Sequence, residues 1–190
     1  MFSPPETAVR HELPFFLRQS LSHFLERGRF LRSYPASPIL NEWMHRDSQG
    51  VFVSLYLNSE MRGCSGSCAR GQSLLRDLQI NAVRAALKDA RFSFNLRRQI
   101  QDLEFSVVEV GEMTVAPIVD CAGFFTQLEN VEQGLILRYQ GKGAALLPRK
   151  MRELGSPEAI YSYLLAKSAI DRISEFERVQ LTRFDCRTMI

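Results

Sequence analysis

A cysteine set among glycines and arginines, in the stretch RGCSG at residues 62–66, is the first candidate for chemistry. Cys64 follows Arg62 and Gly63 directly, and Gly66 comes two positions later. Nearby cations favour the thiolate form of a cysteine, which is the nucleophilic form. Glycines let a ligand or a neighbouring backbone approach closely. The stretch therefore predicts a catalytic or ligand-binding site centred on Cys64.

Three other interpretations of this stretch stay open. Cys64 and Cys68 form a C-x3-C pair, but a structural zinc site needs four ligands, and Cys121 and Cys186 are single; no metal and no cofactor is predicted. The loop that follows is rich in glycine and leads into a helix, whose N-terminal amides attract anions, although it matches no nucleotide-binding motif. Finally, Cys64 fits equally well as a small residue buried in a turn.

A cysteine nucleophile also needs a group that takes its proton. The three histidines, His11, His23 and His45, all precede the motif. Glu104 becomes the candidate base if its strand pairs next to this hairpin, and that strand also carries Ser106. The predicted site thus has Cys64 and Glu104 as catalytic residues, and its proposed ligand-binding residues for a small anionic group are Arg62, Gly63, Gly66, Arg91 and Ser106. Glu104 and Ser106 fit equally well as one face of a half-exposed strand.

Hydrophobic periodicity predicts the elements that must position these residues. Helices are predicted at 13–27, with Pro14 in the first turn and Gly28 as the stop, at 73–89, and from Pro157 to about Lys167. Strands are predicted at 50–57, 103–110 and 178–184, with "MRGCSG" returning from 50–57 as a hairpin that its glycines then break. The segment "LILRYQGKGAALL" is predicted to form a second hairpin, in whose turn Gly141 and Gly143 are expected to supply positive φ. Residues 119–133 are ambiguous.

Mixed helices and hairpins without strict strand–helix alternation predict an α+β fold with largely antiparallel sheets flanked by helices. A chain of 190 residues with 45% hydrophobic residues is expected to form a single domain, with residues 1–12 as a loosely ordered segment. The net charge of +3 permits anionic ligands, but no basic stripe interleaved with aromatics predicts nucleic-acid binding. No signal peptide and no membrane helix is predicted, so a cytoplasmic location is expected.

Three segments together resemble the AMMECR-one family. "GVFVSLYLNSEMRGCSG" is similar to that family's strand and Leu-Arg-Gly-Cys-Ile-Gly motif, "INAVRAALKDARF" to its next helix, and "LEFSVVEV" to the strand after it. Farther on, "GLILRYQGKGAALLP" and "LLAKSAI" match its glycine hairpin and Lys-containing helix. The resemblance covers about residues 13–186. Ser65 departs from the family, because it stands where the motif has isoleucine.

The resemblance implies a larger part built from both chain ends, a smaller middle part, and a cleft between them that holds the motif. It implies association with Memo-type or radical SAM proteins, but it does not imply a reaction. Two hypotheses follow. In the first, the chain is an enzyme or an enzyme component that binds a small anionic substrate around Arg62, Gly63 and Cys64. In the second, it is a non-catalytic binding or adaptor module that offers the same cleft to a partner protein or a metabolite.

Overall fold

The computed structural model describes residues 6–32, 37–68, 71–89 and 96–190. The chain divides into two compact units: unit 1 is Met1–Val110 with Arg187–Ile190, and unit 2 is Gly111–Cys186. The predicted larger part formed from both chain ends and smaller middle part is therefore confirmed. Each unit is described by itself below.

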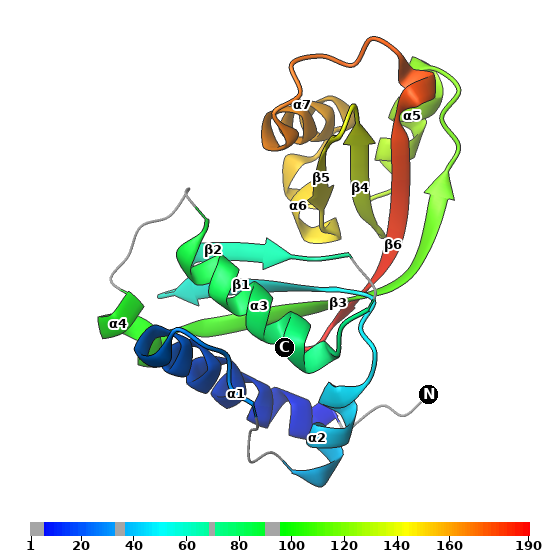
Figure 1. The fold of residues 1–190 in the computed structure, drawn as a ribbon. Coiled ribbons are helices and arrows are strands. Elements are labelled where there is room, and N and C mark those ends of the chain that lie inside the picture. The colour runs from blue at the N-terminus through cyan, green and yellow to red at the C-terminus, as the bar shows by residue number, and fades with distance from the viewer. Residues whose placement is uncertain (1–5, 33–36, 69–70, 90–95) are drawn as a thin grey trace. The chain divides into compact units, whose positions relative to one another are not determined.

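Unit 1 combines helices with one end of the sheet (Figure 1). Its elements are α1 (Glu6–Arg27), α2 (Pro38–His45), β1 (Val51–Leu57), β2 (Glu60–Gly66), α3 (Leu74–Leu87), α4 (Leu96–Gln99), a 3₁₀ turn (Ile100–Asp102) and the first part of β3 (Glu104–Ala116).

The first helix is longer than the sequence predicted. α1 begins at Glu6, so residues 6–12 are helical and the expectation of a loosely ordered segment is wrong for them. Pro14 lies inside the helix rather than in its first turn. The predicted stop is confirmed, because Gly28 has a positive φ of 67° and its N–H donates to the carbonyl of Phe24 at 2.8 Å.

The predicted hairpin is formed by β1 and β2, which pair antiparallel. Asn58 and Ser59 in the turn have φ of 52° and 64°, the pair of positive φ values that tight hairpin turns use. β3 pairs antiparallel with the other side of β1. The glycines do not break β2, because the strand continues through Gly63 to Gly66.

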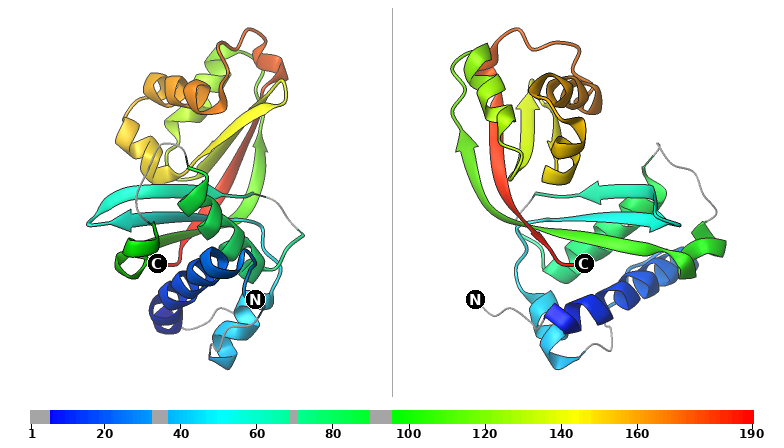
Figure 2. Two further views of the ribbon diagram at one scale, coloured as in Figure 1. Left: turned by 60° about the vertical axis from the view of Figure 1, so that its left-hand side comes forward. Right: turned by 180° about the vertical axis from the view of Figure 1, so that it is seen from behind.

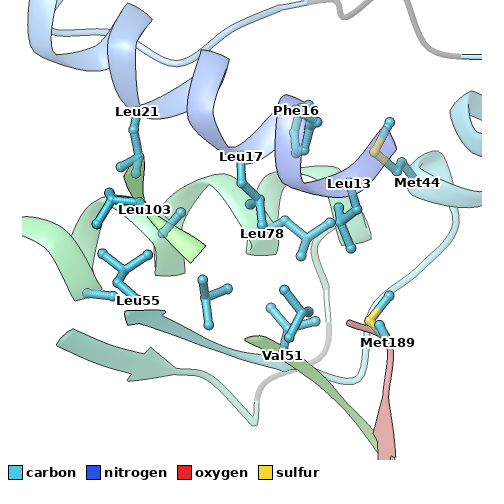
Figure 3. Packing of buried hydrophobic residues seen from close by; sticks show 14 of the residues in the cluster. Leu13, Phe16, Leu17, Leu21, Met44, Val51, Leu55, Leu78, Leu103 and Met189 are labelled. Carbon is cyan, nitrogen blue, oxygen red and sulfur yellow. The ribbon is translucent and has the colours of Figure 1, made fainter. Parts of the chain in front are cut away.

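The core of unit 1 lies between this sheet and its helices. α1 and α3 lie on the same side of the sheet (Figures 1 and 2). Figure 3 shows side chains of α1, including Leu13 and Leu17, pointing toward Leu78 of α3 and toward Val51 and Leu55 of β1. All of these are fully buried. This is the packing that the apolar stripes at 13–27 and 73–89 predicted.

Unit 2 packs helices and strands around a second core. After the rest of β3, its elements are α5 (Cys121–Glu129), β4 (Gly134–Tyr139), β5 (Lys142–Leu146), α6 (Pro148–Leu154), α7 (Pro157–Ser168), a 3₁₀ turn (Phe176–Arg178) and most of β6 (Gln180–Thr188). Phe124 of α5, Leu137 of β4 and Leu164 of α7 are fully buried in this core. Ser156 caps α7, because its hydroxyl accepts a hydrogen bond from the N–H of Ala159.

Two details of unit 2 differ from expectation. Gln140 and Gly141 supply the positive φ of the β4–β5 turn, whereas Gly143 does not. A Cβ at Gly143 would lie 2.6 Å from the carbonyl oxygen of Leu137, so this glycine permits close strand packing instead. The ambiguous segment 119–133 contains α5, which begins at an Asp120 cap.

The strands form one sheet in the order β2-β1-β3-β6-β4-β5. The pairs β1–β2, β1–β3, β4–β5 and β4–β6 are antiparallel. The α+β fold with antiparallel strands is therefore confirmed. Among the described helices, none is both long and apolar enough to cross a membrane.

One ion pair ties the end of α2 to β3. Arg46 follows α2, and its guanidinium pairs with the carboxylate of Glu109, whose side chain is only 11% exposed. The same guanidinium lies over the Trp43 ring at 5.2 Å from its centroid. The carbonyl of Arg46 accepts a hydrogen bond from the N–H of Leu74 at 2.9 Å. The pair therefore helps to join α2, α3 and the sheet.

We expect Glu109→Gln to lower the free energy of unfolding by about 2 kcal/mol, because the Glu109 carboxylate is only 11% exposed and water screens its attraction to Arg46 poorly. Urea denaturation measures this. The control is Glu60→Gln, which removes a partner of Arg62 that is 70% exposed and should change the same quantity by less than about 0.5 kcal/mol. Equal effects of both substitutions would contradict the structural role given to the Arg46–Glu109 pair.

Candidate functional site

Three small polar side chains form a row across the strands of unit 1. Cys64 of β2 pairs with Ser54 of β1, and Ser54 pairs with Ser106 of β3. The neighbours Val53 and Leu55 belong to the core under α1 and α3. Because side chains alternate along a strand, the row Cys64–Ser54–Ser106 lies on the opposite face of the sheet.

Cys64 is held by hydrogen bonds at both its side chain and its backbone. Its Sγ accepts a hydrogen bond from the hydroxyl of Ser54 at 3.3 Å. Its backbone N–H donates to Oδ2 of Asp89, just beyond α3, at 3.0 Å. The residue Cys64 is partly exposed, whereas Ser54 is only 7% exposed. The arrangement therefore fixes the position of a residue that is not fully buried.

The two motif glycines are explained by close packing. A Cβ at Gly63 would lie 2.0 Å from the carbonyl oxygen of Ala85 on α3, far inside van der Waals contact. A Cβ at Gly66 would lie 2.0 Å from Cδ1 of Phe52, whose ring covers this glycine. Gly63 thus lets α3 lie directly on β2. The predicted ligand-binding role of both glycines stays a prediction.

The alternate face of β2 carries a polar network that the sequence reasoning missed. The hydroxyl of Ser65 donates to Oδ1 of Asn81 at 3.1 Å. The Asn81 amide donates to the Ser67 hydroxyl at 3.1 Å and to the Asp77 carbonyl at 3.0 Å. Ser67 in turn donates to Oδ1 of Asp77 at 3.4 Å. Ser65, the departure from the family motif, therefore has a polar partner in α3.

A signal for this network was present in the sequence. Asp77 and Asn81 are spaced like the packing stripe of Leu74, Leu78 and Ala82, so they lie on the buried face of α3. Asp77 is 1% exposed and Asn81 is fully buried. A buried carboxylate near the first turn of α3 repels anions, which disfavours the interpretation of the loop before α3 as a phosphate cradle.

Glu104 lies in β3 on the same strand as Ser106, as predicted, but two paired positions farther along. It pairs with Tyr56, which in turn pairs with Met61 of β2. Two strand spacings and two residues of rise separate Glu104 from Cys64, which corresponds to about 12 Å between their Cα atoms. Direct proton transfer needs hydrogen-bond distance. The hydroxyl of Ser106 donates to the backbone carbonyl of Ile190 at 3.2 Å.

Neither of the two arginines predicted to bind an anion is shown in contact with Cys64. The guanidinium of Arg62 pairs with Glu60, its neighbour on β2. Arg91 lies outside the described residues. His11 and His23 lie in α1 and His45 in α2, so none is part of β1–β3.

No disulfide links Cys64 to another cysteine. All four cysteines lie within the described residues, and none of them forms a disulfide. Cys121 is exposed at the start of α5, and burial raises the pKa of Cys186 in β6 to about 11. Within the described ranges, no three His, Cys, Asp or Glu side chains are grouped so that they could hold a metal ion.

The family model AMMECR1 matches residues 15–189. The chain belongs to the AMMECR1 family, which is the AMMECR-one family of the motifs quoted above. The match covers both units and includes every residue of the Cys64–Ser54–Ser106 row.

Two relatives and one solved structure are similar to this chain. Protein CA_C1420 of Clostridium acetobutylicum is 27% identical over 169 residues, covering 87% of this chain and 34% of its own length. Protein MK0488 of Methanopyrus kandleri is 29% identical over 146 residues, covering 74% of this chain and 67% of its own length. The crystal structure of the uncharacterized protein PH0010 from Pyrococcus horikoshii superposes with a TM-score of 0.71 at 20% identity, covering 96% of this chain and 89% of that chain. The Pyrococcus structure shows a shared fold. This AMMECR1-family chain spans about a third of the length of the clostridial protein.

We expect Gly63→Ala to lower the free energy of unfolding by about 2 kcal/mol or more, because the new methyl group collides with the Ala85 carbonyl and must push α3 from the sheet. Chemical denaturation provides the measurement. Gly123→Ala in α5 is the control, since the added Cβ would meet only the side chain of Asp120, at 3.3 Å, and alanine favours a helix. An unchanged stability of Gly63→Ala would show that α3 and β2 are not in this close contact.

We expect Ser65→Ile, which restores the usual family residue, to destabilise this chain by about 1–2 kcal/mol, because Asn81 Oδ1 loses its donor in a buried position. Ser65→Thr retains the hydroxyl and should be nearly neutral. The comparison uses thermal and urea unfolding of both variants. A stabilising Ser65→Ile would mean that the hydroxyl of Ser65 contributes nothing through Asn81.

Proposed function

We propose that this AMMECR1-family chain is an enzyme or an enzyme component that uses the Cys64 thiol on a small substrate. The observation that carries the proposal is the pair of hydrogen bonds at Cys64: Ser54 donates to its sulfur, and Asp89 accepts from its backbone N–H. A cysteine that only filled space would not need hydrogen bonds at both its sulfur and its backbone N–H. Its partial exposure leaves it open to a reactant.

Each group in this arrangement has a defined task. The Ser54 hydroxyl donates a hydrogen bond to the sulfur and so holds the thiol in one orientation on the strand. Asp89 fixes the backbone of β2 so that the sulfur keeps its position. Ser106, on the same row, donates its hydroxyl proton to Ile190, so its oxygen is left to accept a hydrogen bond from a ligand that lies along the three strands. No described histidine or carboxylate bonds the sulfur, so the proton of the thiol passes to the ligand or to water.

The substrate class and the partners extend the proposal. A small anionic substrate is proposed from the arginines of the motif segments, Arg62 and Arg91, although Arg62 must first release Glu60. Glu104 is proposed to act through an intervening water or ligand atom, since about 12 Å separates its Cα from that of Cys64. A cytoplasmic location and a Memo-type or radical SAM partner are proposed from the family resemblance.

We expect Cys64 to be alkylated faster by iodoacetamide than the exposed Cys121 of the same molecule, with peptide mass spectrometry following both sites over time. The reaction forms a thioether from the thiolate and releases iodide. Ser54→Ala should slow alkylation at Cys64 by about threefold to tenfold, since a hydrogen bond of this kind contributes about 1 kcal/mol. The rate at Cys121 should stay the same.

Two internal controls accompany this measurement. Ser162→Ala, an exposed serine of α7, should leave both rates unchanged. Cys186 should remain nearly unmodified near neutral pH, because its raised pKa keeps it protonated until about pH 11. If Cys64 reacts more slowly than Cys121 and Ser54→Ala has no effect, the nucleophile proposal is wrong.

The second candidate function is a non-catalytic binding or adaptor module. The observation that favours it is the lack of any base at the sulfur among the described side chains, together with the close packing that accounts for Gly63 and Gly66. In that case the Cys64–Ser54–Ser106 row is a contact surface and Cys64 is a small packing residue. An unreactive Cys64 in the alkylation experiment would select this function.

A further inference from the structure

A band of exposed cations covers the outer side of α3 in unit 1. Its members are Arg76, Arg84 and Lys88 at helical spacing, and Arg27, Arg29 and Arg32 in the end of α1 and the segment that follows. We call these six residues the basic band. All six are exposed, and none takes part in an ion pair that the structure describes.

Specific contacts fix the segment after α1 against α3. The side-chain amide of Gln79 donates to the carbonyl of Leu31 at 2.9 Å. The guanidinium of Arg76 lies 4.0 Å from the centroid of the Phe30 ring, and that ring packs on Phe24. Two chain segments therefore present their cations together, in a fixed arrangement, rather than on a loose tail.

The charge of the molecule is unevenly distributed. Unit 1 holds 15 of the 24 Lys and Arg residues but only 11 of the 21 Asp and Glu residues, whereas unit 2 is nearly balanced. Like charges gathered without counter-ions repel one another and oppose folding. An anionic partner on the basic band would remove that repulsion.

The band contains apolar side chains as well as cations. Leu87 is 51% exposed, and the half-buried Ile80 lies between Arg76 and Arg84 on the same helical stripe. Five of the six cations are arginine, the charged residue enriched at protein interfaces, whereas lysine is depleted there. Among the residues that the structure describes, no exposed aromatic ring that could stack on bases interleaves the band, so a single-stranded nucleic acid fits it less well.

We propose that the basic band is a docking surface for an acidic protein segment, namely an amphipathic helix that places carboxylates around an apolar side chain. The apolar residue of the partner contacts Leu87 and Ile80, and its carboxylates pair with the arginines on either side. α3 spans about 21 Å, which matches a partner helix of about 14 residues. This surface is on the helix side of unit 1 and is independent of the Cys64 row.

The test uses the full chain and a fluorescein-labelled synthetic peptide of about 14 residues, with leucines at helical spacing and glutamates at the other positions. Fluorescence anisotropy at about 100 mM salt should show saturable binding. Arg84→Gln with Lys88→Gln should weaken binding about fivefold, and Leu87→Ser should weaken it severalfold. The matched control, Arg138→Gln with Arg172→Gln, removes two exposed cations of unit 2 and should leave binding unchanged.

Three outcomes would overturn the proposal. The first is no saturable binding of the peptide by the unmodified chain. The second is an equal loss in the band variant and the unit 2 control, which would show attraction to net charge alone. The third is binding of a single-stranded oligonucleotide or of phosphatidylserine vesicles that is lost in the band variant while the peptide does not bind. Circular dichroism of each variant confirms that the helices remain folded, and Leu87→Ser, at an exposed site, tests the surface without altering charge.

Discussion

The close contact between β2 and α3 is the constraint on which the candidate site depends. Gly63 removes the side chain that would separate them, and the Ala85 carbonyl occupies that space. Asp89 then reaches the backbone of Cys64, and Asn81 reaches Ser65. Because one face of β2 is committed to α3, alternation along the strand presents Cys64 on the other face beside Ser54. The reactivity proposed for the thiol therefore rests on a packing contact made on the opposite side of the sheet.

At both edges of the sheet, a side chain from a helix or from just beyond one forms a hydrogen bond with a backbone group of the edge strand. β2 is one edge of the strand order, and Asp89 accepts from its Cys64 N–H. β5 is the other edge, and Lys167 donates to the carbonyl of Ala145 at 2.8 Å. An edge strand with free backbone groups invites pairing with other chains. Lys167, which belongs to the helix that resembles the family pattern, thus has a structural role within unit 2.

Local chemistry made much of the fold predictable from the sequence. Turn residues located both hairpins, and the apolar stripe of α3 placed the helix against the sheet. Pro14 was misleading, because a proline at a first turn and one inside a longer helix look alike without the tertiary packing of residues 6–12. In the site, the strand of Glu104 does pair next to the hairpin, but β1 lies between it and the strand of Cys64. Strand order and pairing register set the distance from Glu104 to Cys64, and periodicity fixes neither of them. Asp77 and Asn81 were not predicted as polar partners of β2, because they are polar residues within the otherwise apolar stripe of α3.

The order of the segments has a consequence for synthesis on the ribosome. Unit 2 is an insertion in unit 1, whose chain leaves at Val110 and returns at Arg187. On its return, Met189 and Ile190 exchange backbone hydrogen bonds with Val107 at 2.8 and 3.1 Å. Those bonds close a loop of about 80 residues, which is a slow, entropically costly step. The strand that carries Ser106 therefore lacks its last backbone partner until the whole of unit 2 has left the ribosome. Unit 2 can complete its fold before unit 1, which still needs residues 187–190.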